Sequence, residues 1–76
     1  MRNALSKQVG NRVRELRDQA GISQEELAAR ASLHRNYIGS IERGERDVGV
    51  AALERLAGAL GISLSEFFQP FRRNQR

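Results

Sequence analysis

The segment from residue 23 to residue 44 constrains the fold most, because it describes two short helices joined by a tight bend. Ser23 can accept hydrogen bonds from the free backbone N–H groups of a first helical turn while Glu26 reaches back, which is the capping-box pattern. Apolar residues at helical spacing then predict a helix over residues 24 to about 31. Its narrow inward stripe is Leu27, Ala28 and Ala31. The small Ala28 lets another helix cross closely.

The second helix of this segment carries a polar face without a carboxylate. Residues 32–33 form the bend, the helix begins near residue 34 or 35, and Gly44 ends it as a C-terminal cap. Ile38 and Ile41 point inward. The polar face comprises Arg35, Asn36, Gly39, Ser40 and Arg43. Such a face, with guanidinium, amide and hydroxyl groups and no acid, suits the base edges and phosphates of DNA.

The rest of the chain predicts three more helices and no strand, so the expected fold class is all-α with five helices. Apolar spacing predicts a helix over about residues 4–19, which Gly21 stops, and another over residues 50–60, which Gly61 ends. Their inward residues are Leu5, Val9, Val13, Leu16 and Ala20 in the first and Leu53, Leu56, Ala57 and Leu60 in the second. Ser63 with Glu66 repeats the capping box and begins a short last helix, which Pro70 closes.

Length and composition bound the kind of protein. The 76 residues predict a single domain over residues 1–69 and a basic, flexible tail over residues 70–76. A domain this small buries only about 60% of its unfolded surface, so a partner subunit is expected to add stability. The absence of cysteine excludes disulfides, thiolate metal sites and thiol nucleophiles. With no signal peptide and no apolar run of bilayer length, we expect a cytoplasmic protein without a membrane partner.

The positive charge of the chain is unevenly placed. Thirteen basic against nine acidic residues give a net charge of +4, which favours a nucleic-acid partner. The excess lies in residues 1–17 and 69–76, whereas residues 18–46 carry four basic and five acidic side chains. The net charge of the chain therefore favours encounter with DNA and nonspecific affinity for it. The hypothesis that the protein recognises a DNA sequence depends instead on the polar face of the second helix of the segment from residue 23 to residue 44.

Several motifs together resemble the Cro/repressor-type, or Xre, family of helix-turn-helix transcriptional regulators. They are SQEELA at residues 23–28, ERG at residues 42–44 and LAGALGIS at residues 56–63, and the resemblance extends from residue 4 to residue 69. Within the family, LHRNYIGSIERGERD at residues 33–47 is most similar to the controller proteins of restriction-modification systems. The resemblance implies a compact five-helix DNA-binding domain whose helix-turn-helix lies at residues 23–44.

Four residues are predicted to contact bases. Arg35 can present two parallel N–H donors to guanine, and Asn36 can pair with adenine through its amide. The resemblance implies base contact for Asn36 and Ser40. Gly39 costs about 1 kcal/mol in a helix interior relative to alanine. Either it permits close approach to the groove or it is simply tolerated, and the sequence leaves both open. The alternative for Arg35 is that it is a solvated surface arginine with no role in DNA binding.

Five residues are predicted to contact phosphate. Ser23 and Gln24 lie where free N–H groups and the helix dipole attract an anion, and the resemblance implies that the Gln24 side chain joins in. It also implies backbone contacts from Arg43 and Arg46, for which surface salt bridges to neighbouring glutamates are the alternative. Tyr37 is amphipathic, and its hydroxyl is a candidate for phosphate while its ring packs at the edge of the two helices.

The resemblance further implies an ion pair between Arg17 and Glu42, which would fix the angle of the DNA-contacting helix. Two unrelated surface charges are the alternative. Three residues depart from the family pattern. Ser32 replaces a glycine in the turn and would be strained at positive φ, and His34 replaces a better N-cap. Asp47 stands where controller proteins favour asparagine, and it is instead a candidate cap for the fourth helix, for which Gly49 is the other candidate.

The aromatic segment near the C-terminus predicts a dimer surface. It comprises Leu64, Phe67, Phe68 and Phe71. Three phenylalanines are too many for so small a core to bury, so one or two should be exposed in a monomer. Packing them with Leu64 and one edge of the fourth helix against a second copy would cover an apolar patch around a two-fold axis. The alternative is that they close the bottom of the monomer core. In a dimer, the two DNA-contacting helices would enter successive major grooves about 34 Å apart.

The sequence therefore predicts a homodimeric regulator that binds a palindromic double-stranded operator and blocks or recruits RNA polymerase. The competing class is a protein-interaction module on the same fold, such as an antitoxin. An enzyme is disfavoured, because the only histidine stands alone and the carboxylates lie on helix surfaces. Nothing indicates a metal, a cofactor or a small-molecule effector.

Overall fold

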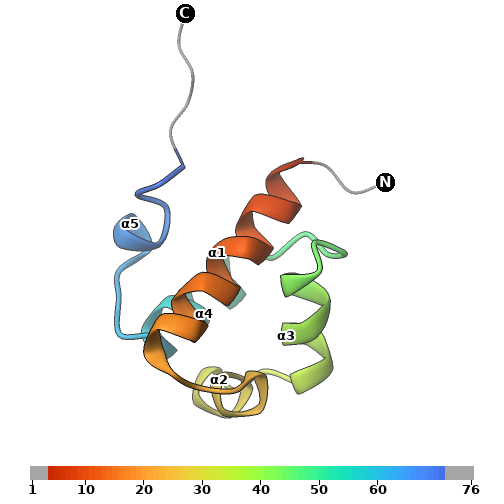
Figure 1. Cartoon of the computed structure of the whole chain (residues 1–76), viewed down its shortest axis with the longest axis vertical. Coiled ribbons are helices and arrows are strands. Elements are labelled where there is room, and N and C mark those ends of the chain that lie inside the picture. The colour runs from red at the N-terminus through yellow and green to blue at the C-terminus, as the bar shows by residue number, and fades with distance from the viewer. Residues whose placement is uncertain (1–3, 72–76) are drawn as a thin grey trace, which may run out of the picture.

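The computed structural model describes residues 4–71, and within that range the chain is all-helical with five helices and no strand. The helices are α1 (Ala4–Ala20), α2 (Gln24–Ala31), α3 (Arg35–Glu42), α4 (Val50–Ala59) and α5 (Leu64–Phe67). In Figure 1, α3 and α5 lie on opposite sides of α1, and α2 lies at one end of the molecule. The predicted all-α class is thus confirmed. The greater part of the expected tail, residues 72–76, lies outside the described residues.

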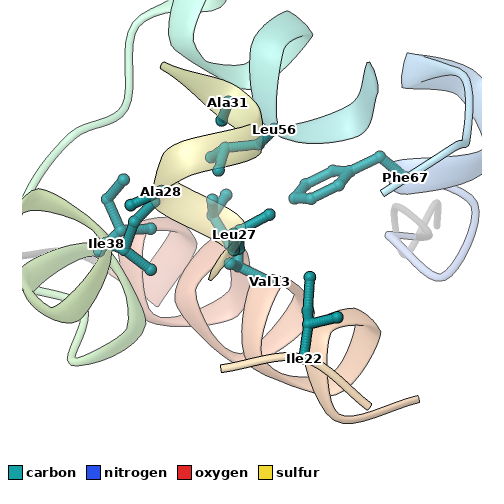
Figure 2. Close-up of a cluster of buried hydrophobic side chains, with 10 residues drawn as sticks. Val13, Ile22, Leu27, Ala28, Ala31, Ile38, Leu56 and Phe67 are labelled. Atoms are coloured by element: carbon teal, nitrogen blue, oxygen red, sulfur yellow. The ribbon is translucent and has the colours of Figure 1, made fainter. Parts of the chain in front are cut away.

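One apolar core holds the helices together, because each contributes side chains that water does not reach. The largest fully buried side chains are Phe67, Leu27, Ile38, Ile41, Leu56 and Val13. Figure 2 shows the Phe67 ring entering from α5 toward Leu27 and Leu56. Burial of each such side chain stabilises the fold by about 1.5 to 3 kcal/mol. Among residues 4–71, no helix is long and apolar enough to cross a membrane.

The two capping boxes expected from the sequence differ in the structure. At α5, Ser63 Oγ accepts from the Glu66 N–H and the Glu66 carboxylate accepts from the Ser63 N–H, so the box is complete. At α2, Ser23 Oγ accepts from the Glu26 N–H at 3.0 Å. The Glu26 carboxylate instead pairs with Arg30 one turn later, at 2.5 Å. The sequence predicted a complete capping box at α2. The hydrogen bond from the Glu26 N–H to Ser23 Oγ is present, but the predicted return bond to the Glu26 carboxylate was wrong.

The bend between α2 and α3 is made without glycine. Ser32 lies in the left-handed region, with φ 57° and ψ 44°, and its N–H donates back to the end of α2. A left-handed conformation costs a non-glycine residue about 1 to 2 kcal/mol. His34 caps α3, since its Nδ1 accepts from the Asn36 N–H at 3.1 Å. The strained turn and the imidazole cap are both as the sequence suggested.

The ends of α1 and the start of α4 depart from the sequence prediction. Leu5, 54% exposed, and Ala20 lie outside the core, because α1 is longer than the core that it covers. Asp47 does not cap α4. Its carboxylate accepts from the Ser6 hydroxyl at 2.6 Å, and Gly49 begins α4 without a side-chain cap.

Gly10 sets the distance between α1 and α3, a role that no sequence signal had indicated. A Cβ at this position would lie 2.2 Å from the Ile41 carbonyl oxygen and 3.0 Å from that of Glu42. Both neighbours are backbone atoms and cannot turn aside as a flexible side chain would. Only glycine therefore permits this helix crossing, and the crossing fixes how α3 projects from the domain.

Candidate nucleic-acid interface

An open hollow of about 590 Å³ lies where the N-terminus of α2 meets α3. It is lined by Arg17, Ser23, Gln24, Glu25, Arg35, Asn36, Gly39 and Arg43. Three of the four predicted base-contacting residues and three of the five predicted phosphate-contacting residues therefore share one surface. The other three predicted contact residues, Tyr37, Ser40 and Arg46, do not line it.

A buried carboxylate supports the floor of the hollow. The Glu42 side chain is only 4% exposed, and it accepts from Arg17 Nε at 2.7 Å and from Arg17 Nη2 at 3.1 Å. Hydrogen bonding to Glu42 raises the pKa of Arg17, so this guanidinium stays cationic. Arg17 Nη1 also donates to the Ile22 carbonyl at 3.0 Å. The expected ion pair is thus present and joins α1, the loop before α2, and α3.

Glu42 also orients Gln24 at the N-terminus of α2. Gln24 Nε2 donates to Glu42 Oε1 at 3.0 Å, which uses one of its two N–H groups. The second N–H remains for an anion at the helix N-terminus. The carboxylate that fixes α3 therefore also aims a predicted phosphate contact.

The polar face of α3 is not free of acid in three dimensions. Arg35 Nη1 pairs with Glu25 of α2 at 2.5 Å, and both side chains are more than half exposed. The Asn36 side chain makes no hydrogen bond with another described residue. Base contact by Arg35 therefore requires exchange of the Glu25 carboxylate for a base, whereas Asn36 is available at once.

Gly39 is buried beneath two longer side chains. A Cβ there would lie 3.1 Å from Arg43 Nη1 and 3.7 Å from Gln24 Oε1. Its small size therefore lets Arg43 lie across the helix. Arg43 in turn pairs with Glu45 at 3.0 and 3.1 Å, and hydrogen bonding to Glu45 raises the pKa of Arg43. The surface salt bridge that the sequence offered as an alternative is present in the unbound protein.

Ser40 lies beneath the surface, contrary to the sequence prediction. It is 7% exposed, its hydroxyl donates to the Tyr37 carbonyl at 2.8 Å, and it accepts from Arg46 Nε at 2.9 Å. The error arose because helical spacing alone does not show that the loop after α3 folds back over this position. Tyr37 is partly buried, with the Arg46 guanidinium carbon 5.4 Å from its ring centre.

One of the four residues predicted to form the dimer surface, Phe67, does not lie on the surface of the monomer. Phe67 is fully buried in the monomer core, so its assignment to an interface was wrong and the alternative reading was right for this residue. Leu64, Phe68 and Phe71 are only partly buried. The Phe68 ring lies 4.9 Å from that of Phe67 and 5.0 Å from that of Phe71.

Arg12, which no sequence motif singled out, anchors α5 to α1. Its Nε donates to the Phe67 carbonyl at 2.7 Å and its Nη2 to the Glu66 carbonyl at 2.8 Å. A basic residue on the face of α1 next to the apolar stripe was the only signal. It gave no indication of a partner more than fifty residues away.

Comparison with known families places the chain in a class. The family model described as helix-turn-helix matches residues 13–67, which span α2, α3 and the hollow between them. The chain belongs to this helix-turn-helix family.

Within it, the relatives include controller proteins. Control protein C.MunI of Mycoplasma is 42% identical over 67 residues, covering 87% of this chain and 90% of that protein. The crystal structure of the restriction-modification controller protein C.AhdI from Aeromonas hydrophila is 44% identical, with a TM-score of 0.84 over 87% of this chain and all of that one. The controller protein C.Esp1396I, solved as a tetramer in complex with its natural 35 base-pair operator, is 32% identical, with a TM-score of 0.85 and 90% of each chain covered.

Proposed function

We propose that this chain is a sequence-specific regulator of transcription, of the controller type, that binds double-stranded operator DNA with α3 in the major groove. The observation that carries the proposal is the hollow between α2 and α3. It places Arg35 and Asn36, which suit base edges, beside the N-terminus of α2 and Gln24, which suit a phosphate. The relatives named as controller proteins, one of them solved on its operator, support the same function.

Each residue has a distinct part in this mechanism. Arg35 exchanges Glu25 for a guanine, and Asn36 pairs with a neighbouring base. Ser23 and Gln24 bring the first turn of α2 against a phosphate on one side of the groove, while Arg43 holds the backbone on the other. Gly39 contributes no contact of its own and keeps the helix thin where Arg43 crosses it.

A homodimer places two such surfaces on one operator. Leu64, Phe68 and Phe71 remain partly exposed in the monomer and offer an apolar patch for a second copy. A two-fold axis there gives a palindromic site with half-sites roughly one helical turn apart, about 34 Å. Bound in the cytoplasm, such a dimer acts on transcription by blocking RNA polymerase or by recruiting it.

The competing function is a protein-interaction module on the same fold, such as an antitoxin. A protein-binding surface is expected to expose large apolar anchors. The lining of the hollow contains four charged and three uncharged polar side chains and one glycine, with no apolar anchor among them. This composition favours DNA.

The test is selection of bound duplexes from a random DNA pool, run in parallel with wild type and Arg35→Ala. The proposal expects a two-fold symmetric site from the wild type and a relaxed or lost preference from the variant, since one bidentate guanine contact supplies about 1 to 3 kcal/mol of discrimination. Selection of no sequence by the wild type would contradict the proposal and favour the protein-interaction module.

A further inference from the structure

Arg46 differs from the other arginines predicted to contact DNA. Arg35 is paired with Glu25 and Arg43 with Glu45. Arg46 has no carboxylate partner within residues 4–71, and its two recorded partners are both uncharged. Its positive charge is therefore uncompensated by an ion pair, and a phosphate can approach it without displacing a glutamate.

The two uncharged partners hold Arg46 in one place. Its Nε donates to Ser40 Oγ at 2.9 Å, and its guanidinium carbon lies 5.4 Å from the centre of the Tyr37 ring. Both partners belong to α3, so the loop residue Arg46 is fixed to the helix predicted to enter the groove. A cation over an aromatic face is attracted by the ring quadrupole while its outer N–H groups remain free.

The Ser40 hydroxyl is oriented to accept a hydrogen bond from Arg46. Its single proton is directed to the Tyr37 carbonyl at 2.8 Å, which turns a lone pair toward Arg46 Nε. Because Ser40 is only 7% exposed, water competes little for that lone pair. Ser40 itself is too deep to contact a base.

We propose that Ser40 is a positioning residue that presents Arg46 to a backbone phosphate. An unrestrained arginine loses much rotamer freedom when it binds, whereas an arginine already held by hydroxyl and ring loses little. The inference rests on the proposed function, because it gives Arg46 a phosphate to contact.

The experiment compares wild type, Ser40→Ala, Arg46→Ala and the double variant for binding to a short mixed-sequence duplex over a series of salt concentrations. A phosphate contact is independent of sequence, so no operator is needed. Arg46→Ala is expected to weaken binding and lower the salt slope by about 1. Ser40→Ala is expected to weaken binding about three- to tenfold with the slope unchanged, since the charge remains and one neutral hydrogen bond is lost.

The double variant separates positioning from a structural role. In the Arg46→Ala background, Ser40→Ala is expected to have no further effect on affinity. An equal loss in both backgrounds would overturn the proposal, because Ser40 would then act through the shape of α3 alone. Ser65→Ala, which removes an exposed hydroxyl from α5, is the matched control and is expected to bind as wild type.

Failure of the inference and failure of the proposed function give different results. If Arg46→Ala weakens binding and Ser40→Ala does not, the positioning role is overturned while the DNA-binding function stands. If Arg46→Ala changes neither affinity nor slope, Arg46 contacts no phosphate and the inference is overturned. The proposed function itself is judged by whether the wild type selects a duplex from the random pool.

Discussion

Removal of Arg17 is expected to destabilise the whole domain, because it strands a buried carboxylate. Glu42 is 4% exposed and loses two of its three donors, retaining only Gln24 Nε2. Breaking a buried pair from one side costs about 3 to 5 kcal/mol. The lower end applies here, because one donor remains and the hollow admits water. Arg17→Met should therefore lower the free energy of unfolding by about 3 kcal/mol.

That loss is large for a chain of 76 residues. At about 0.05 to 0.15 kcal/mol per residue, the total free energy of unfolding is roughly 4 to 11 kcal/mol. A loss of about 3 kcal/mol corresponds to a fall in Tm of roughly 12 to 24 °C for a domain of this size. Thermal and urea unfolding followed by circular dichroism measure both quantities.

Two further variants make the reasoning refutable. Arg30→Met breaks a pair with Glu26 whose side chains are about half exposed, and should cost less than about 1 kcal/mol. The double variant Arg17→Met with Glu42→Met removes the stranded charge and should recover most of the loss. An Arg17→Met protein no less stable than Arg30→Met, or a double variant no better than Arg17→Met, would refute the assignment of a buried, mutually dependent pair.

Three other outcomes follow from the contacts described. Glu25→Gln removes the carboxylate that Arg35 must exchange for a base and should raise affinity for the selected operator more than for a mixed-sequence duplex, whereas Glu54→Gln, the same charge change on α4, should raise both alike in binding titrations. Gly10→Ala places a Cβ 2.2 Å from a backbone oxygen and should cost about 1 to 3 kcal/mol in urea unfolding. Gly58→Ala meets nothing within 4 Å and should gain about 0.4 to 1 kcal/mol. Phe68→Asp should leave a folded monomer by sedimentation and weaken binding to a palindromic site.

Local signals predicted the helices well. Ser23 and Ser63 cap the helices that they were expected to cap, and Ile38 and Ile41 are buried as their spacing requires. Ser32 has the positive φ that its place in the turn demanded. These features depend on residues close in sequence, so short-range chemistry is sufficient to predict them.

Features that depend on how helices cross could not be predicted in this way. The pairing of Glu25 with Arg35 and the burial of Ser40 under Arg46 require the angle of α3 and the path of the loop after it. The sequence shows that Gly10 lies inside a predicted helix, but it does not show that the backbone of α3 lies against this glycine. The sequence does not distinguish Phe67 from Phe68 and Phe71. Only the position of α5 shows that Phe67 is the one buried in the core.

The most direct measurement is the change in backbone amide resonances on adding the selected duplex to the isotopically labelled protein. The account predicts that the largest shifts fall around the hollow, at Gln24, Arg35 and Asn36. A second open hollow, of about 620 Å³, lies on another face and includes Leu5 and Phe71 in its lining. Shifts concentrated there, with Arg35 and Asn36 unchanged, would contradict the claim that this chain contacts DNA through α2 and α3.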